Sequence, residues 1–239
     1  MQTLLTKIGK GANSSKDLTW EEAKRAMRLL VEGQVTPVQV GAFVMAMRMK
    51  TESVTELAAL VSAAREYLPP LIINTDLPLV DLPTYAGKET TFHASIAGAI
   101  IAASSGVAIL MHGYESIPNR VGSGPVLAEL GIPADLSPSQ VALEVASKGF
   151  GYLDVSLYHP PLARFLDLRK ELGLRTFFHP VSRMLNPARA KAQVIGMTHP
   201  PYFEKTAEAA RMLGTPRGLV VRGMEGEPEL SIAGITKVI

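Results

Sequence analysis

The stretch VAILMHGYE, residues 107–115, decides the fold class of this 239-residue chain. Its first four residues are apolar and predict a buried strand, and His112 follows at the point where that strand ends. A second apolar run that leads into a polar loop, VDLPTYAGK, occupies residues 80–88. Ligands of open α/β sheets bind beyond the carboxyl ends of the strands. Both loops are therefore candidate parts of a binding site.

The pattern around these loops divides the chain into two parts. In the first seventy residues apolar positions recur at helical spacing after Thr19, Thr36 and Ser53, and these residues predict three capped helices. From residue 71 onward short strands alternate with helices, which requires crossover connections and a mostly parallel sheet. We predict an α/β protein with a small N-terminal helical domain, residues 1–70, and a larger mostly parallel α/β domain, residues 71–239. The end of the chain, residues 229–239, is predicted as a strand.

The composition excludes several classes of protein. Without cysteine the chain has no disulfide framework, no thiolate metal site and no thiol nucleophile. No uninterrupted apolar segment is long enough to span a bilayer, and the N-terminus lacks the basic flank and cleavage site of a signal peptide. We therefore expect a cytoplasmic protein without a membrane partner. Its three short N-terminal helices are expected to pack on the rest of the chain or on a second subunit.

The charge is unevenly distributed, although the net charge is only +2. Residues 159–193 carry seven basic and two acidic side chains, hence +5, which leaves −3 for the remaining chain. One interpretation is an ordinary solvated helix face. The other is a site for a phosphate, a carboxylate or a nucleic-acid backbone, because arginine offers a planar fork of donors. The seven basic residues are Arg164, Arg169, Lys170, Arg175, Arg183, Arg189 and Lys191.

The loop after the first predicted strand has features of an anion site. Gly87 permits close approach of the backbone, Lys88 supplies a positive charge, and the free amides at the start of the next helix favour an anion. Thr91 and Ser95 add hydroxyl groups. One glycine is a weak signal, and an ordinary tight turn explains it equally well.

The order of the motifs is more specific than any one of them. Residues 80–92 are followed by a strand that ends in His112-Gly113, by VGSG at 121–124, by RKELGLRTF at 169–177 and by LNPA at 185–188. This succession resembles the anthranilate phosphoribosyltransferase family, with its nucleoside phosphorylase/phosphoribosyltransferase fold, over essentially the whole chain. The resemblance implies an active site in the cleft between the two domains, Mg²⁺ as a cofactor and a homodimer formed through the N-terminal helices. It also implies that a final strand-and-helix portion of the family is missing and that the fold is truncated at the C-terminus.

Several positions depart from the motifs of the family. Its glycine-rich loop GTGGD reads TYAGK at residues 84–88, and its KHGN motif reads MHGY at residues 111–114. Glu115 replaces the basic residue that follows, and only Glu229 remains of the acidic pair that the family uses for magnesium. Because these groups act on the leaving diphosphate, we expect transfer to anthranilate to be weak or absent.

The residues and the resemblance together predict a site. Arg169, in the intact RKELG motif, matches the residue with which the family recognises the carboxylate of anthranilate. The interpretation of His112 is open between a hydrogen bond within its loop and a contact to a ligand. The metal site is predicted at Glu229. The predicted substrate-binding residues are Gly87, Lys88, Thr91, Ser95, His112, Gly113, Arg120 and Arg169.

Three functions are compatible with this interpretation. The first is a glycosyl or phosphoribosyl transferase of this family that acts on a different acceptor, with Lys88, Arg120 and Arg169 holding a phosphorylated small molecule or a carboxylate. The second is a nucleic-acid-binding paralogue that holds a single strand in a basic groove, with an affinity that falls steeply with salt. The third is a non-catalytic scaffold whose dimer is the functional unit.

Overall fold

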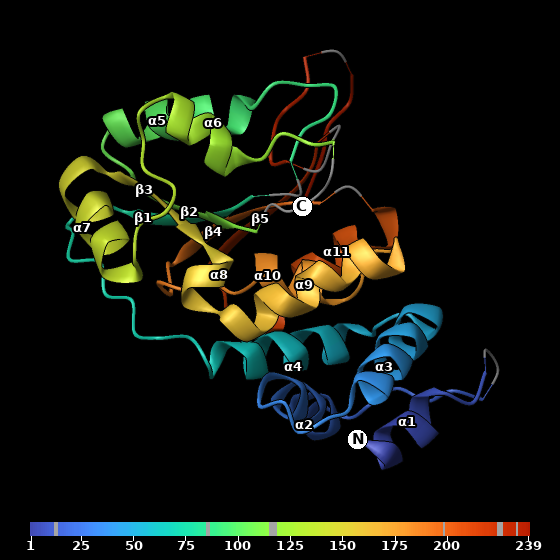
Figure 1. Ribbon diagram of the computed structural model, residues 1–239. Helices are drawn as coiled ribbons and strands as arrows, with labels where there is room; N and C mark the ends of the chain where they lie inside the picture. Colours follow the sequence, from blue (N-terminus) through green and yellow to red (C-terminus); the bar gives the residue numbers. More distant parts are fainter. Residues whose placement is uncertain (12–13, 85–86, 115–118, 198, 224–226, 233) are drawn as a thin grey trace.

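The computed structural model describes residues 1–11, 14–84, 87–114, 119–197, 199–223, 227–232 and 234–239. Its N-terminal part consists of helices, and the remainder is a sheet with helices on both faces (Figure 1). This arrangement confirms the predicted α/β class, with a small helical domain followed by a larger, mostly parallel α/β domain. The boundary between residues 70 and 71 falls in the connection from the last N-terminal helix to the first strand, and it stays a prediction.

The helices of the N-terminal part begin at local capping motifs. The hydroxyl groups of Thr19, Thr36 and Ser53 each accept the backbone amide three residues later, as the sequence predicts. The sequence pattern predicts three helices here, whereas the described residues contain a fourth, short one at the N-terminus. The four are α1 (Gln2–Ile8), α2 (Trp20–Val31), α3 (Pro37–Lys50) and α4 (Val54–Arg65).

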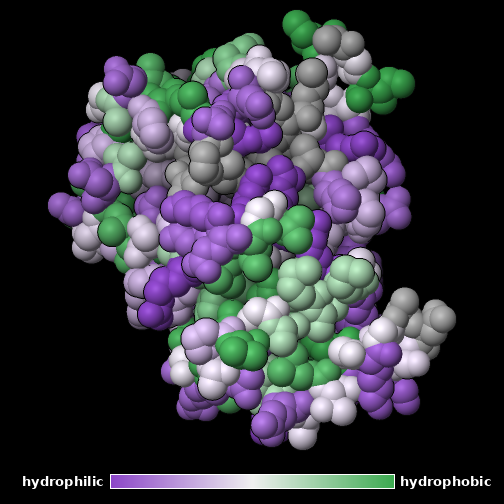
Figure 2. All heavy atoms as spheres, turned by 45° about the vertical axis from the view of Figure 1, so that its right-hand side comes forward, coloured by the Kyte–Doolittle hydropathy of each residue, from purple (hydrophilic) through white to green (hydrophobic). Residues whose placement is uncertain are grey.

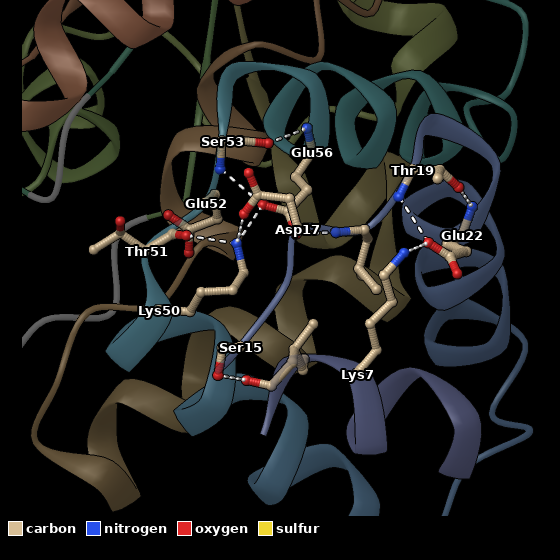
Figure 3. A network of polar contacts seen from close by, with 12 residues as sticks. Lys7, Ser15, Asp17, Thr19, Glu22, Lys50, Thr51, Glu52, Ser53 and Glu56 are labelled. Carbon is tan, nitrogen blue, oxygen red and sulfur yellow. Dashed lines mark hydrogen bonds and ion pairs between the residues drawn. The ribbon is translucent and has the colours of Figure 1, made fainter. Parts of the chain in front are cut away.

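A buried carboxylate ties the start of α4 to the segment between α1 and α2 (Figure 3). Glu56 is fully buried and accepts the amides of Leu18 and Ser53, both at 2.8 Å, and the ammonium group of Lys50 at 2.6 Å. Lys50 also donates to Asp17 at 2.6 Å. A buried charge is tolerated when it is paired and hydrogen-bonded. This network therefore fixes the connection from α3 to α4, which lines the candidate site.

The sheet has the strand order β3-β2-β1-β4-β5-β6 in the part of the chain that the structure describes. All neighbouring strands are parallel except β5 and β6. The predicted strand over residues 229–239 is wrong for most of its length, because among its described residues only Lys237 and Val238 form a strand, paired with β5. The strands are β1 (Leu79–Pro83), β2 (Ala108–Gly113), β3 (Phe150–Asp154), β4 (Ala192–Gly196), β5 (Arg217–Arg222) and β6 (Lys237–Val238).

Helices cover both faces of the sheet (Figure 1). On one face lie α5 (Ala94–Ser104) and α6 (Ser123–Glu129), whereas α7 (Pro138–Lys148) packs beside β3 in the core of the opposite face. The helices on the other face separate the sheet from α4, which contacts α10 and α11. Because the first five strands are parallel, their carboxyl ends meet at one edge of the sheet. Besides α7, the described helices of this face are α8 (Val155–Tyr158), α9 (Pro160–Leu172), α10 (Phe178–Arg183) and α11 (Pro200–Met212).

A row of aromatic side chains joins the helical part to the α/β part. Phe43 of α3 packs edge-on against Phe177, with ring centroids 5.8 Å apart, and Phe177 contacts Phe178 at 4.1 Å. Phe178 in turn stacks on Phe165 of α9 at 4.6 Å. Burying a phenylalanine side chain contributes about 1.5–3 kcal/mol. This packing therefore holds residues 175–183 in place against both parts of the molecule.

The helices that the structure describes contain between 4 and 14 residues. None of them combines the length and the apolar character that crossing a membrane requires.

Candidate functional site

A cavity of about 280 Å³ lies where the helical part meets the α/β part. Its walls come from the end of α3 with the connection to α4, from the end of α9 with the segment 173–177, from α10, and from the start of α11. Figure 2 shows strongly hydrophilic side chains near the level at which the two parts meet, and apolar surface over the helical part below. We call this cavity the arginine pocket. Its charged and polar lining residues are Arg48, Glu52, Arg169, Arg175, Thr176, His179, Arg183, His199 and Tyr202.

Arg169 lies near the end of α9 and is the predicted site residue that reaches this pocket. Its Nη1 atom is buried and has no hydrogen-bond partner among the described residues. Burial lowers the pKa of Arg169, and the positive charge of Arg120 lowers it further. A buried donor without an acceptor costs free energy, which an anionic ligand would recover. A carboxylate is the matching acceptor, because its two oxygens fit the planar fork of a guanidinium group.

Arg175 and Arg183 bring two further guanidinium groups to the pocket. Arg48 Nη1 donates to the carbonyl oxygen of Arg175 at 2.6 Å, and Arg183 Nη1 donates to the carbonyl oxygen of Gly196 at 2.9 Å. Burial lowers the pKa of Arg183 to about 9, and the charges of Arg175 and Arg169 act in the same direction. With Arg48 and Arg169, four guanidinium groups line the pocket, so the pocket concentrates positive charge.

The other titratable side chains of the pocket add little opposite charge. Burial raises the pKa of Glu52, whose carboxylate accepts the hydroxyl group of Tyr202. Burial and the charge of Arg183 lower the pKa of His179 to about 3, so that its imidazole is neutral. The Nδ1 atom of His179 accepts the amide of Thr176 at 3.2 Å. The arrangement is that of an anion site with a neutral imidazole beside it.

Gly87 and Lys88 lie in a different place, against residues 120–121. The backbones of Lys88 and Val121 exchange two hydrogen bonds of 2.8 Å. Gly87 has a φ of 79°, and a Cβ atom there would come within 2.8 Å of the carbonyl oxygen of Val121. Glycine is therefore required by the left-handed backbone and by the close approach of the two segments. Arg120 donates to the carbonyl oxygen of Gly87 and to the carboxylate of Glu89, both at 3.2 Å.

Glu229, the predicted metal ligand, is held by a cation of the chain itself. Lys88 Nζ lies 2.5 Å from Oε2 of Glu229, and the amide of Ser95 at the start of α5 donates to Oε1 at 2.8 Å. Within the described residues no three His, Asp or Glu side chains are grouped so that they could hold a metal ion. Mg²⁺ demands an octahedral shell of oxygen ligands. With both oxygens of Glu229 engaged, the donor set does not fit Mg²⁺.

His112 is buried in a polar network between strands. Its Nδ1 atom lies 2.9 Å from the hydroxyl group of Tyr158, and its Nε2 atom lies 3.1 Å from a carboxylate oxygen of Asp81. The other oxygen of Asp81 accepts the side-chain amide of Gln193 at 2.8 Å. Gly113 follows as the last residue of β2. Tyr158 thus gives Nδ1 of His112 a structural partner, whereas Nε2 and the nearby Asp81 Oδ1 form no hydrogen bond among the described residues. A contact between His112 and a ligand stays a prediction.

Thr91 borders a groove of about 690 Å³ between α5 and α6. The lining of this groove is mostly apolar and includes Phe92, Ile96 and Ile100. It shares no lining residue with the arginine pocket. Lys88 also lines this groove, so the residues of the first predicted loop lie together and outside the lining of the arginine pocket.

The structure thus distributes the predicted site residues over separate places. Arg169 lies in the arginine pocket, His112 lies in the network between the strands, and the residues around Lys88 lie near Glu229. The ligand contacts of all of them stay predictions. Residues 85–86 and 115–118 of the two loops, Glu115 among them, lie outside the described residues. The sequence interpretation did not include Arg48, Arg175, Arg183 and His179 in the site, although the basic excess of residues 159–193 indicated two of them.

Comparisons with known proteins bear on the family. The helical bundle domain of the glycosyl transferase family matches residues 2–68, and the a/b domain of the same family matches residues 79–239. The anthranilate phosphoribosyltransferase of Methanocorpusculum labreanum is 38% identical over 226 residues, which cover 94% of this chain and 66% of the relative. The chain spans about two thirds of the length of the curated relatives that it matches.

Solved structures agree with this result. The crystal structure of anthranilate phosphoribosyltransferase from Thermus thermophilus matches with a TM-score of 0.85 and 34% identity, over 98% of this chain and 69% of that one. The anthranilate phosphoribosyltransferase of Saccharomyces cerevisiae shares the fold, with a TM-score of 0.81 and 22% identity over 99% of this chain and 70% of that one. Both domains are matched in their order, and the relatives are similar over nearly the whole chain. The chain therefore belongs to the anthranilate phosphoribosyltransferase family of glycosyl transferases.

Proposed function

We propose that this protein is an anthranilate phosphoribosyltransferase-like glycosyltransferase whose arginine pocket binds the carboxylate of the acceptor. The observation that carries this proposal is the buried Nη1 atom of Arg169, which lacks an acceptor among the described residues in a pocket with four guanidinium groups. A cavity of about 280 Å³ suits a small acid better than a polymer. The pocket also lies between the two parts of the molecule, where the family resemblance implies the active site.

The reaction class requires positioning more than protein nucleophiles. In the reaction that gives the family its name, the nitrogen of anthranilate forms the new bond to the ribose carbon as diphosphate leaves with the bonding electron pair. A relative from Saccharomyces cerevisiae was solved in complex with PRPP and Mg, which supports a phosphorylated sugar as the second ligand here. Holding the acceptor carboxylate on Arg169 would orient its nitrogen for attack.

We further propose that transfer to anthranilate itself is weak or absent in this chain. Met111 stands where the family has a lysine, and residues 84–88 lack most glycines of the diphosphate loop. Glu229 is engaged by Lys88 in the place where the resemblance implies a metal ligand. These groups stabilise the leaving diphosphate, and removing one such stabilising group costs about 10²–10³ in kcat.

Calorimetric titration tests the acceptor site directly. The wild-type protein is expected to bind anthranilate more tightly than aniline, which lacks the carboxylate. Arg169→Met should weaken anthranilate binding about ten- to hundredfold, the usual value of a charge-assisted hydrogen bond. Lys170→Met is the matched control, because Lys170 lies next in the same helix, is exposed and pairs with Asp167. Equal loss in both variants, or no preference over aniline, contradicts the proposal.

A turnover assay tests the expected weakness of the reaction. With phosphoribosyl diphosphate, anthranilate and Mg²⁺, the rate should fall far below the roughly 1–10³ s⁻¹ that is typical of enzymes. Turnover within that range would show that the missing motif residues are replaced by others. A panel of other aromatic and aliphatic amino acids as acceptors then distinguishes a changed substrate from a lost activity.

The two alternative functions, nucleic-acid binding and a non-catalytic dimeric scaffold, stay predictions that fewer observations support. Three of the seven basic residues of the segment 159–193 line the arginine pocket instead of an open surface. Binding of single-stranded DNA at two salt concentrations tests the nucleic-acid function, which requires a steep loss of affinity at the higher salt. A cytoplasmic location is likewise a proposal.

We also propose that the protein forms a homodimer through its N-terminal helices. Val38 and Met49 of α3 are 80% and 79% exposed, although both are large apolar residues. They lie about three helical turns apart, so they project from the same face, and Met45 lies on that face between them. An exposed apolar stripe of this kind marks an interaction surface.

A further inference from the structure

We propose that Lys88 takes the place of a divalent metal ion in this protein, so that the phosphate group of its ligand binds at Lys88 and the start of α5 without Mg²⁺. This inference rests on the proposed function, which implies a phosphorylated ligand. It goes further by assigning the cation that balances the charge of that ligand to the chain itself. The ligand class is a phosphate or diphosphate ester.

The ammonium group of Lys88 contacts Glu229, the predicted metal ligand, where a metal ion would otherwise contact it. Lys88 is only 3% exposed, and its Nζ atom lies 2.5 Å from Glu229 Oε2. Its backbone is fixed by the two hydrogen bonds to Val121, and Gly87 permits these segments to approach. A lysine held in this way is a fixed point charge. Of its three N–H donors, Glu229 engages one.

The chain holds Glu229 in this position from the other side as well. The amide of Ser95 donates to Oε1 of Glu229 at 2.8 Å. A Cβ atom at Gly223 would come within 2.3 Å of the carbonyl oxygen of Glu227. The backbone at Gly223 is therefore in close contact with the backbone at Glu227. The amide of Glu229 donates to the same carbonyl oxygen at 2.8 Å. The carboxylate is thus presented to Lys88 by tightly packed backbone.

The start of α5 supplies the remaining features of an anion site. The amide of Ser95 already binds an anion, namely the carboxylate of Glu229. The hydroxyl group of Ser95 is buried and has no hydrogen-bond partner among the described residues, and the residue is 8% exposed. A buried hydroxyl group without a partner is costly unless a ligand satisfies it. A phosphate oxygen can accept from the hydroxyl, from the amide and from the ammonium group of Lys88.

The negative charge of the ligand could be balanced by a metal ion or by Lys88, and Glu229 has opposite roles in the two cases. If a metal ion bound here, Glu229 would be its ligand, and removing the carboxylate would weaken the binding of a diphosphate. If Lys88 is the cation, Glu229 competes with the diphosphate for the ammonium group and for the Ser95 amide. Removing its negative charge would then strengthen binding. The sign of the change decides between the two.

Calorimetric titration with inorganic pyrophosphate, in excess MgCl₂ and in excess EDTA, measures this sign. The wild-type protein is expected to bind pyrophosphate equally well in both solutions. Glu229→Gln should bind it about tenfold more tightly in EDTA, because a competing negative charge is lost. Lys88→Met should bind it about tenfold more weakly, and Lys170→Met should be unchanged. Circular dichroism of each variant establishes that it is folded, and Glu229→Gln remains informative if Lys88→Met does not fold.

Several outcomes overturn the inference. They are binding of pyrophosphate by the wild-type protein only in MgCl₂, weaker or unchanged binding by Glu229→Gln, and no binding in either solution. A titration with Mn²⁺ followed by electron paramagnetic resonance is an independent readout, and a Mn²⁺ site that Glu229→Gln removes would also overturn it. None of these measurements depends on Arg169. Anthranilate binding is therefore measured separately, in the absence of pyrophosphate. If anthranilate binds and pyrophosphate does not, the inference about Lys88 is wrong while the proposed function stands.

Discussion

The imidazole of His179 couples the arginine pocket to the acid stability of the protein. Burial and the nearby Arg183 hold its pKa at about 3, whereas a histidine in the unfolded chain has a pKa of about 6.5. Between these values the unfolded state binds one proton more than the folded state. The free energy of unfolding therefore decreases as the pH falls from about 6.5 toward about 3, by up to about 1.4 kcal/mol per pH unit.

Replacement of His179 by asparagine is expected to remove this contribution. Urea unfolding of the wild-type protein and of His179→Asn, measured between pH 7 and pH 4, gives the slope of the unfolding free energy against pH. The slope of the variant should be smaller by up to about 1.4 kcal/mol per pH unit, which corresponds to the uptake of one proton. Burial also lowers the pKa of His159, but that residue is present in both proteins and its effect cancels. Identical slopes would show that His179 is protonated in the folded state.

Single residues of the site differ in how much the sequence reveals about them. Arg169 is predictable, because it lies within an intact motif and its carboxylate role needs a forked donor. Arg48 has no such signal, since it reaches the pocket only when Phe43 of α3 packs on Phe177. The pairing of Lys88 with Glu229 is equally hidden, because the two residues are distant in the sequence and meet only in the folded sheet domain.

At the level of elements, the connection from α3 to α4 depends on one buried acid. Glu56→Gln keeps the shape of the side chain. Among the described residues it leaves the ammonium group of Lys50, which is 7% exposed, with only the exposed Asp17 as its charged partner. Removing one partner of a buried ion pair typically costs about 3–5 kcal/mol. We expect a loss of stability near the lower end of this range, because Asp17 remains. Chemical denaturation of the variant measures it.

The matched control for this experiment is Glu208→Gln. Glu208 pairs with Arg211 on the surface of α11, and a surface pair of this kind contributes little. The control should therefore unfold at nearly the same denaturant concentration as the wild-type protein. An equal and small effect of both substitutions would contradict the role assigned to Glu56. Because Arg48 of α3 and Glu52 of the connection to α4 line the arginine pocket, Glu56→Gln should also weaken anthranilate binding.

The elements that the sequence predicts well are those with local signals. The helices that begin at Thr19, Thr36 and Ser53 carry their caps within four residues, and the caps form as expected. The short helices α8 and α10 carry weaker signals, and the sequence pattern does not predict them. α10 forms where Phe177 and Phe178 are buried, so tertiary packing decides its existence. The short β6 likewise exists only where the chain end reaches β5.

On the scale of the whole molecule, the two parts meet through polar as well as apolar contacts. Arg65, the last residue of α4, donates to the carbonyl oxygens of Leu185 and Met184 at 2.9 and 2.6 Å. Glu52 in the α3–α4 connection binds Tyr202 of α11. The helical part is therefore joined to the α/β part at both ends of α4. The arginine pocket lies at this junction, so its shape depends on the position of the helices relative to the sheet.

The proposed dimer makes a prediction at this same scale. The stripe of Val38, Met45 and Met49 on α3 would be buried by the same stripe of a second copy, which is the usual geometry of a symmetric dimer. The double substitution Val38→Glu and Met49→Glu places two charges in that contact and should convert a dimer to a monomer. Leu143→Glu on α7 is the control, because Leu143 is also apolar and 69% exposed. Light scattering after size-exclusion chromatography gives the mass of each protein. A monomeric wild-type protein, or a dimer that survives the double substitution, would exclude this surface as the interface.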